Sequence, residues 1–371
     1  MGSLDTTLPE LRNAAGKSQG QLANDIGISR QAYSAIEHGT STPSTEIALR
    51  LATALNTTVE SLFRLRQPPS LETAKLTEPL LTGDLVRANI HRVGERWVAR
   101  PLLGTPSGPA VTKSLPIANA LVHASTSAGE AAIDLMEQTR EVALVAVGCD
   151  PSVAVVAAHL QSRGVELSWH EMGSVAALQE LAAGNAHVAG CHLLDRETRE
   201  YNLPAIARYL PFSTTVITFA VWDQGLVVAP GNPKQIRGVE DLARPGVLTV
   251  NREMGSGSRT LLDDALAGSG IDTELVAGYN REAQSHLSVA EAVSIGLADT
   301  GIAVRAAAIA FGLDFVSLGQ ERYDLVIPNH FVEEDAVGEL LLALRRPGLQ
   351  RQIEALGGYD VACMGNQVTA T

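Results

Sequence analysis

The sequence predicts two folds in one chain: a small all-α domain at the N-terminus, then a larger α/β domain built on a parallel sheet. Three observations predict this arrangement. Apolar residues recur at helical spacing through the first 66 residues. Gln67–Ser70 contains two consecutive prolines, which forbid helix continuation and indicate a linker. Beyond about residue 121, short apolar runs alternate with helical patterns, as in βαβ units. A chain of 371 residues favours two or three domains. We place these domains at residues 1–66, 67–120 and 121–371.

Composition argues against several classes of protein. Three cysteines (Cys149, Cys191 and Cys363) give neither a disulfide framework nor metal-ligand spacing, which favours a reducing cytoplasm. No leader segment opens the chain and no apolar run reaches the ~18 residues of a membrane span, so we expect neither export nor a membrane contact. The net charge is −13, and acidic and basic residues balance over the first 66 residues. The excess negative charge therefore lies in the remainder, which argues against general polyanion binding.

The first segment shows two short helices separated by a glycine. Leu22 and Ile26 lie four residues apart on one helix face, and Gly27 ends that helix. Ser29 is placed to cap a second helix that runs to about His38. Further apolar turns complete a small core, at Ile47, Leu51, Leu55, Val59, Leu62 and Phe63.

The segment from Gln19 to His38 has the pattern of a helix-turn-helix. Ala23 supplies the small residue needed where two helices touch, and Gly27 tolerates the positive φ of the tight turn. The apolar residues that would lock the two helices together are Leu22, Ile28, Tyr33 and Ile36. The segment resembles the Xre-type, phage-repressor-like helix-turn-helix family, and the likeness covers roughly residues 8–65.

That resemblance implies that the second helix lies in the major groove of double-stranded operator DNA. Arg30, Gln31 and Ser34 would then face the base edges, because Arg pairs with guanine and Gln with adenine through two hydrogen bonds. Ser29 is expected on a phosphate, and Gln19 on a phosphate or a base edge.

Other residues of the motif receive a structural interpretation. Tyr33 falls at an inward position and is expected in the core, and Glu37 is expected in a local salt bridge. Members of the family often carry a basic residue after the second helix, where this chain has Thr40 and Ser41. Attraction to phosphates should therefore be modest. We expect a homodimer or higher homo-oligomer that meets two half-sites.

The remainder of the chain predicts a hairpin and then alternating strands and helices. Residues 82–102 indicate a β-hairpin with Gly94-Glu95 at its turn, and residues 103–120, rich in Gly, Pro, Ser and Thr, indicate a loop. The alternating strands are expected at 142–147, 165–169, 187–190 and 247–250, and the helices at 152–160, 174–183 and 259–267.

Three turns rich in Gly and Ser each lie between a predicted strand and a predicted helix, at residues 148–152, 173–174 and 255–259. Free backbone N–H groups and serine hydroxyls at such places suit an oxygen-rich anion. One such turn alone is usually only a helix cap. Three of them at the carboxyl ends of successive strands indicate a ligand site, because open parallel sheets bind ligands there.

The α/β segment resembles the type II periplasmic-binding-protein fold, and specifically the substrate-binding-like domain related to molybdate-binding proteins. The likeness spans roughly residues 120–340. The stretches that carry it are 147–160, 173–195, 224–263 and 285–308, the last containing Gly-x-Ala-Asp-x-Gly. It implies two lobes with two crossovers and a cleft between them.

The resemblance also implies which residues line the cleft. One lobe would supply Asp150, Pro151, Ser152 and Ser174, and the other Ser256, Gly257, Ser258 and Arg259. Further candidates are His192, for which a structural role is an equal alternative, and Ser285, His286 and Arg305. The serines suit a molybdate- or tungstate-like oxyanion as effector, whereas the arginines and histidines suit a small carboxylate equally. No cofactor and no metal ligand set is expected.

The predicted function is a ligand-responsive one-component transcription regulator. An alternative is an enzyme of molybdenum-cofactor metabolism with a regulatory DNA-binding head, although the sequence shows no nucleophile–base–acid set. Another is a DNA-binding protein whose second domain only oligomerises. Redox sensing through Cys149 and Cys191 stays open, although buried cysteine more often acts as a small hydrophobe.

Overall fold

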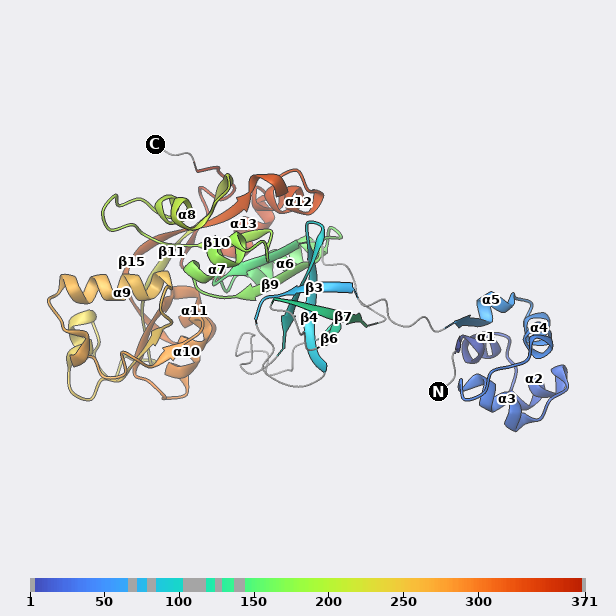
Figure 1. Cartoon of the computed structure of the whole chain (residues 1–371). Helices are drawn as coiled ribbons and strands as arrows, with labels where there is room; N and C mark the ends of the chain where they lie inside the picture. The colour runs from blue at the N-terminus through green and yellow to red at the C-terminus, as the bar shows by residue number, and fades with distance from the viewer. Residues whose placement is uncertain are drawn as a thin grey trace. The chain divides into compact units, whose positions relative to one another are not determined.

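The computed structural model of the chain describes residues 4–65, 72–78, 85–102, 118–123, 129–136 and 144–368. The chain divides into two compact units, an N-terminal unit of Met1–Leu71 and a C-terminal unit of Glu72–Thr371 (Figure 1). The predicted linker at 67–70 and residues 103–117 of the predicted loop at 103–120 lie outside the described residues. None of the described helices combines the length and the apolar character that crossing a bilayer requires.

The N-terminal unit is a bundle of short helices around a core that includes the predicted Leu22, Ile26, Tyr33 and Leu51. The first and last strands of this unit pair as a two-stranded antiparallel sheet, in which Thr6 is opposite Phe63. The sequence did not indicate this sheet, because three-residue strands carry no periodic pattern. Its elements are β1 (Leu4–Thr6), α1 (Leu8–Ala14), α2 (Gln19–Ile26), α3 (Arg30–Glu37), α4 (Thr45–Ala54), α5 (Val59–Leu62) and β2 (Phe63–Leu65).

Serine caps and one left-handed glycine set the boundaries of α2 and α3. Ser18 forms a capping box with Gln21 at the start of α2, and the Ser29 hydroxyl accepts the N–H of Ala32 at the start of α3. Gly27 between them has a φ of 76°, which lies in the region that favours glycine. The predicted helix-turn-helix is therefore confirmed in its geometry.

The C-terminal unit begins with a small closed barrel with the strand order β3-β5-β4-β6-β7. The predicted hairpin is part of it, because β4 and β5 are antiparallel and Val93 pairs with Arg96 across the turn. The other strands were not predicted, since each is short and since β3 pairs with β5 and β7, which lie far along the chain. The strands are β3 (Glu72–Leu76), β4 (Leu85–Val93), β5 (Arg96–Pro101), β6 (Ala120–His123) and β7 (Glu130–Leu135).

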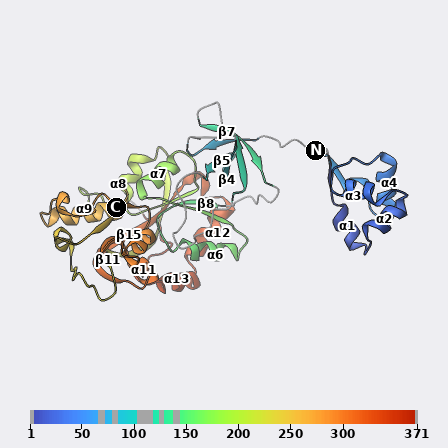
Figure 2. The same cartoon turned by 90° about the horizontal axis from the view of Figure 1, so that it is seen from below.

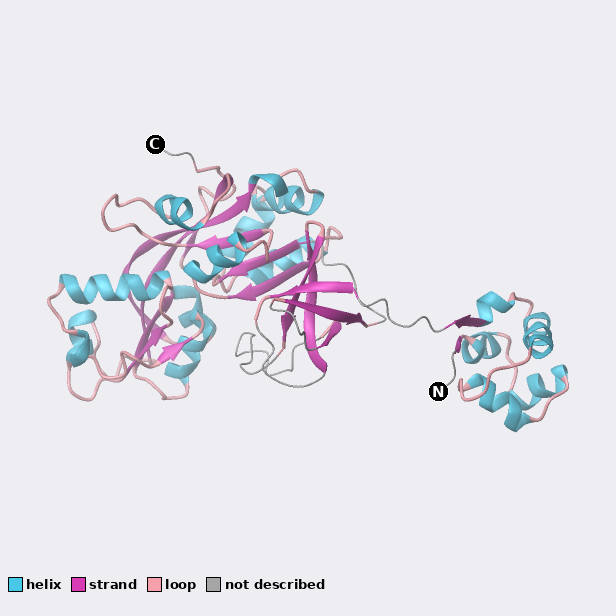
Figure 3. Cartoon of the chain, in the orientation of Figure 1, coloured by secondary structure: helices cyan, strands magenta, loops and turns pink. Residues whose placement is uncertain are grey.

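A larger α/β body follows the barrel and consists of two lobes (Figure 3). Lobe 1 contains β8 (Leu144–Gly148), α6 (Val153–Gln161), β9 (Leu167–Glu171), α7 (Ser174–Ala182), β10 (Val188–Cys191), α8 (Leu203–Tyr209), η4 (Asn329–Phe331), α12 (Asp335–Leu344), α13 (Pro347–Glu354) and β16 (Tyr359–Asp360). Lobe 2 contains η2 (Val239–Ala243), β12 (Thr249–Arg252), α9 (Gly257–Gly268), η3 (Thr273–Leu275), β13 (Glu282–Ala283), α10 (His286–Ser294), β14 (Thr300–Val304) and α11 (Arg305–Ala310).

Two long antiparallel strands connect the lobes: β11 (Thr214–Val228) and β15 (Asp314–Pro328). In lobe 1 they continue a parallel set formed by β9, β8 and β10, and in lobe 2 a parallel set formed by β13, β12 and β14. The expected parallel sheet is thus present in each lobe, and the two expected crossovers are the antiparallel strands between them (Figure 1). The carboxyl ends of the parallel strands in both lobes face the region where the lobes meet.

The barrel packs against lobe 1 (Figures 1 and 2). Arg100 of β5 forms an ion pair with Glu180 of α7 at 2.5 Å. His91 of β4 lies 3.2 Å from His170 of β9, between the two Nε2 atoms. Both contacts are largely removed from solvent, so the barrel and lobe 1 form a continuous packed body.

Candidate functional site

The first candidate site is the outward side of α3. Ser29 caps this helix through a 3.1 Å bond from Ala32 N–H. Arg30 and Gln31 are exposed, and Ser34 one turn later is half-buried. The structure therefore brings these predicted residues together on the first turns of the helix, which is where helix-turn-helix proteins contact bases.

The buried carboxylate of Glu37, the last residue of α3, connects this helix to α1 and α2. Glu37 is only 5% exposed, and it accepts a hydrogen bond from Arg12 Nε at 2.8 Å and another from Gln19 Nε2. The Tyr33 hydroxyl lies 3.4 Å from the same carboxylate, and burial raises the pKa of Tyr33 to about 12. The expected core position of Tyr33 and the expected salt bridge of Glu37 are both confirmed. The amide of Gln19 is held by Glu37 at the start of α2.

The second candidate site lies where the two lobes meet, and Cys149 and His192 form its lobe 1 side. Each directly follows or ends a parallel strand, and both are fully buried. Cys149 Sγ lies 3.3 Å from His192 Nε2, and His192 Nδ1 lies 2.9 Å from a carboxylate oxygen of Glu321 on β15. Burial lowers the pKa of His192, but the Cys149 sulfur and Glu321 outweigh burial and raise that pKa to about 10.

Lobe 2 contributes His286, the first residue of α10. It is fully buried, and neither of its ring nitrogens has a hydrogen-bond partner among the described residues. Burial, followed by the positive charges of Arg252 and His192, lowers its pKa well below the ordinary value. One ligand atom each from Cys149, His192 and His286 lie within 4.8 Å of one another, so these three side chains could together hold a metal ion.

Arg252, at the end of β12, brings a buried positive charge to the same place. Although burial lowers its pKa, the neighbouring Glu253 carboxylate outweighs burial and raises it, so the guanidinium stays charged. Two of its nitrogens bind Glu253 at 2.8 and 2.9 Å, whereas Nη1 has no partner within the described part of the chain. Burial raises the pKa of the nearby Glu171 carboxyl to about 7. We call Cys149, His192, Arg252 and His286 the interlobe site.

The lobes touch through the Gly- and Ser-rich turns that the sequence singled out. The backbone N–H of Val175 donates to the Gly255 carbonyl between the lobes at 3.3 Å. Within the lobes, the Ser174 hydroxyl accepts the backbone N–H of His192 at 3.2 Å, and Ser256 caps α9 through Arg259 N–H. A Cβ on Gly257 would overlap the carbonyl oxygen and the imidazole of His192. The start of α9 therefore lies directly against the lobe 1 side of the interlobe site, and the lobes are closed.

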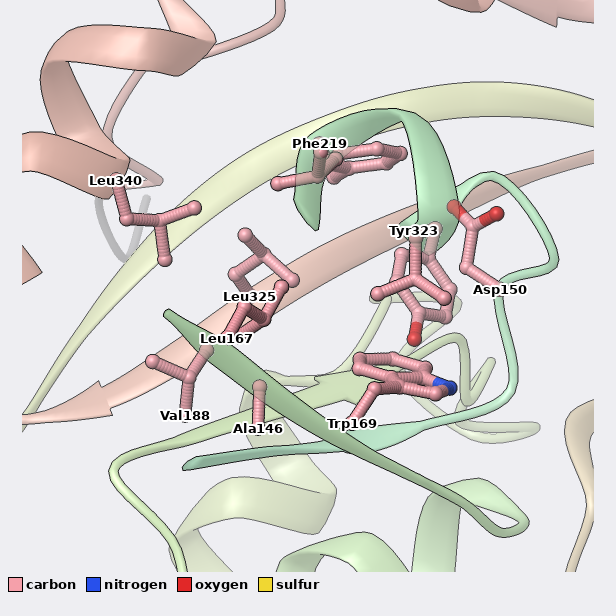
Figure 4. Close-up of a pocket in the computed structure, with 11 residues that line it drawn as sticks. Ala146, Asp150, Leu167, Trp169, Val188, Phe219, Tyr323, Leu325 and Leu340 are labelled. Carbon is pink, nitrogen blue, oxygen red and sulfur yellow. The ribbon is translucent and has the colours of Figure 1, made fainter. Parts of the chain in front are cut away.

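Asp150 and Ser152 lie deeper in lobe 1. Asp150 Oδ1 accepts bonds from Ser152 N–H at 2.7 Å and from the Tyr359 hydroxyl at 2.8 Å, and burial raises the pKa of this carboxyl. A cavity of about 30 Å³ lies beside them, and Figure 4 shows Tyr323 between Asp150 and Trp169 at one end of it. Most of the side chains that line this cavity are apolar, and its volume is too small for an organic ligand.

The remaining sequence-predicted residues lie around this centre. Ser258 accepts a bond from Gln224 at 3.0 Å, and Ser285 caps α10. Arg259 is bound to Glu282 at 2.9 Å and stacks over Tyr279. Arg305 pairs with Asp223 at 2.6 Å, and its side chain is 36% exposed. Ionic partners within the protein already engage both of these arginines.

Sequence reasoning missed Arg252, Glu321 and Trp222 as parts of this site. All three lie on strands rather than in turns, so no local pattern distinguishes them from ordinary strand residues. The Trp222 ring lies 4.9 Å from His192 and 5.5 Å from His286. Cys149 was considered as a small hydrophobe or a redox sensor but not as part of this site, because its partners are distant in sequence.

Two family models match this chain. The model of the PBP (periplasmic-binding-protein) superfamily domain matches residues 157–345, just over half of the chain, and a helix-turn-helix model matches residues 10–62. The chain therefore belongs to the PBP superfamily and carries an Xre-type helix-turn-helix domain at its N-terminus. Neither matching model describes an enzyme.

Two uncharacterised proteins are similar to parts of this chain. The protein YvgK of Bacillus subtilis (strain 168), whose function is uncharacterised, is 33% identical over 228 residues, which cover 60% of this chain and 73% of YvgK. An uncharacterised protein from the 5′ region of a 2Fe-2S ferredoxin gene of Clostridium pasteurianum is 36% identical over 110 residues, covering 29% of this chain and 97% of that protein.

Solved structures with a similar chain path include transport proteins for oxyanions. The tungstate ABC transporter from Geobacter sulfurreducens shares 17% identity, with 57% of this chain and 97% of that chain covered and a TM-score of 0.45. The sulfate-binding protein SubI from Mycobacterium tuberculosis H37Rv shares 20% identity over 58% and 85%, with a TM-score of 0.44. Likeness at these TM-scores does not extend to the ligand.

Proposed function

We propose that this chain is a one-component transcription regulator that acts in the cytoplasm. Its N-terminal unit binds operator DNA through α3, and its C-terminal unit binds a small anion between the two lobes. The observation that carries the ligand part is the buried guanidinium of Arg252, whose Nη1 has no partner among the described residues. A buried charged group with an unused donor is costly unless a ligand supplies the acceptor.

The surroundings of Arg252 favour recognition by hydrogen bonds over net charge. Glu253 neutralises Arg252, and Glu321 faces His192, so the protonated groups at the site are largely balanced. The starts of α7 and α9 add backbone N–H groups, and Ser174, whose hydroxyl oxygen accepts the His192 N–H, adds a hydroxyl donor. Such donors fit a molybdate- or tungstate-like oxyanion or a small carboxylate.

The ligand part is tested by thermal melting of the full chain against a panel of oxyanions and small carboxylic acids. A ligand at 100-fold its Kd should stabilise the folded protein by about 2.7 kcal/mol. Arg252→Met should remove the shift, as should Ser174→Ala combined with Ser258→Ala. The exposed Arg237 of the same lobe gives the matched control, and Arg237→Met should keep the shift. A wild-type protein that melts identically with every compound would refute the anion-binding proposal.

The DNA part is tested by selecting duplexes that the full chain retains from a random pool. Arg30→Ala and Gln31→Ala should each weaken binding to the selected operator by about 1–3 kcal/mol per lost bidentate contact. The control is Arg163→Ala in lobe 1, whose side chain pairs with Glu339 on the surface. Unchanged operator affinity in both α3 variants would show that α3 does not read the bases.

We further propose that a homodimer or higher homo-oligomer couples the two activities. Ligand binding would stabilise the closed lobes, and closure would alter the spacing of paired helix-turn-helix domains. Coupling of this kind requires only that the ligand binds the open and closed forms with different affinity.

A further inference from the structure

The interlobe site also contains three potential metal ligands, which the proposed anion does not need. Cys149, His192 and His286 are each 0% exposed, and together they offer one sulfur and two imidazole nitrogens within 4.8 Å of one another. His286 has no hydrogen-bond partner at either ring nitrogen among the residues described. Two unsatisfied nitrogens on one buried side chain are unfavourable, and a ligand that accepts a lone pair would satisfy one of them.

The orientation of His192 also suits a ligand that accepts a lone pair. Its Nδ1 lies 2.9 Å from Glu321, and its Nε2 points to Cys149 Sγ at 3.3 Å. A carboxylate on the far nitrogen fixes the tautomer and increases the basicity of a metal-binding histidine. Glu321 is therefore placed as a positioning residue for Nε2.

We propose that Cys149, His192 and His286 bind one Zn²⁺ ion, with a fourth coordination position left open. A thiolate and two imidazoles are ligands that zinc prefers, and three protein ligands with an open position are typical of reactive or ligand-binding zinc sites. On a tetrahedral zinc ion with bonds of about 2.0–2.3 Å, neighbouring ligand atoms lie roughly 3.3–3.6 Å apart. The Cys149–His192 pair already has this separation at 3.3 Å, and a ring nitrogen of His286 lies within 4.8 Å of both atoms.

Binding of the ion is balanced by loss of protons. Zinc binds the Cys149 thiolate and neutral imidazoles, so the thiol proton and any proton on His192 Nε2 leave to solvent. No oxidation or reduction accompanies this step.

The ligands come from both lobes, which gives the ion a structural consequence. Cys149 and His192 belong to lobe 1, whereas His286 begins α10 in lobe 2. A zinc ion would therefore hold the lobes closed, because opening would remove His286 from it. The proposed zinc site goes beyond anion recognition. It rests on the proposed regulator only where zinc binding is expected to affect DNA binding.

The test uses the full chain after dialysis against a chelator. It is titrated with Co²⁺ followed by absorbance, and with Zn²⁺ in competition with a coloured indicator. We expect one equivalent per chain, a thiolate-to-cobalt absorption band in the near ultraviolet, and displacement of Co²⁺ by Zn²⁺. Cys149→Ser should abolish the band, and Glu321→Gln should lower metal affinity by about 10–100-fold, as for other outer-shell partners.

Controls separate metal binding from folding. Cys363 is exposed and far from the site in sequence, so Cys363→Ser should leave the stoichiometry and the band unchanged. His286→Asn should weaken binding while tryptophan fluorescence, which arises only from the C-terminal unit, stays native-like. Absence of the thiolate band, or binding that survives both Cys149→Ser and His286→Asn, would overturn the proposal.

The outcomes also separate this proposal from the regulator. A chelated protein that still melts higher with an oxyanion and still binds its operator, but takes up no Co²⁺, contradicts the zinc site alone. A protein that binds Co²⁺ through Cys149 but shows neither an anion response nor DNA binding contradicts the regulator and supports the zinc site.

Discussion

Glu37 is a residue on which the geometry of α3 depends. Its carboxylate joins α1, α2 and α3 through Arg12, Gln19 and Tyr33. Removing one partner of a buried ion pair leaves the other charge uncompensated. We expect Glu37→Ala to cost about 3 kcal/mol in the local unfolding free energy of the N-terminal unit, measured by amide hydrogen exchange of α2 and α3.

The control for Glu37 is an exposed ion pair in the same unit. Glu46 pairs with Arg50 at 2.6 Å, with side chains 71% and 53% exposed, so Glu46→Ala should change the same free energy by less than about 0.5 kcal/mol. Equal effects of the two substitutions would contradict the role assigned to Glu37.

Gly257 is the second residue with a decisive geometric role. Because a methyl group there would overlap His192, Gly257→Ala should keep the lobes apart. We expect this variant to fold but to lose the ligand-induced melting shift. Gly268, at the other end of α9, has nothing within 4 Å of a built Cβ, so Gly268→Ala should retain the shift. A normal ligand response in Gly257→Ala would mean that the closed contact is not part of binding.

The barrel and lobe 1 meet through two histidines, His91 and His170, that stay neutral. Burial, assisted by the charge of Arg100, lowers the pKa of His91 to about 3, and burial also lowers the pKa of His170. An unfolded histidine has a pKa of about 6.5, so the unfolded state binds more protons between about pH 6.5 and 3. The contribution of His91 is therefore fully present above about pH 6.5 and is lost as the pH falls.

The stability of the C-terminal unit should therefore depend on pH through His91. Between pH 6.5 and 5, His91 should cost the C-terminal unit up to about 1.4 kcal/mol per pH unit, and His91→Gln should flatten that part of the dependence. Urea unfolding followed by the fluorescence of Trp97, Trp169 and Trp222 measures this, because all three tryptophans lie in the C-terminal unit. His38→Gln, an exposed change in the N-terminal unit, should leave the slope unaltered.

Elements with a strong local pattern could be predicted from the sequence, and elements defined by distant pairing could not. The helices capped by Ser18 and Ser29 and the strand–helix units of both lobes follow from caps, glycines and apolar spacing. The barrel strands escaped prediction because β3 pairs with β5 and β7, far along the chain. The long strands β11 and β15 gave no signal that they would span both lobes.

Some residues of the candidate site could also be predicted from the sequence, and others could not. Ser174, Ser256 and Gly257 were found because a Gly-Ser turn before a helix is visible in sequence. Arg252 and Glu321 were not, because a charged residue on a strand is usually solvent-exposed and only the three-dimensional pairing shows its burial.

The proposed regulator requires a coupling free energy between ligand binding in the C-terminal unit and DNA binding in the N-terminal unit. If the ligand changes operator affinity by some factor, operator DNA must change ligand affinity by the same factor. Typical couplings are about 1–3 kcal/mol, or roughly 5- to 150-fold. We expect calorimetric ligand titrations of the full chain, with and without operator, to show this reciprocal change. Equal ligand affinity in both titrations, together with intact DNA binding, would favour a second unit that does not signal to the first.

The two long strands also make lobe 2 a single uninterrupted insertion. Lobe 2 leaves β11 after Val228 and returns at Asp314, and these two residues are paired directly across the strands. The boundaries of the insertion are therefore neighbours, and a short turn could replace everything between them without stretching the remaining chain. Lobe 2 could thus be exchanged between related proteins, which would alter the proposed effector specificity while the barrel and the N-terminal unit keep their chain connections.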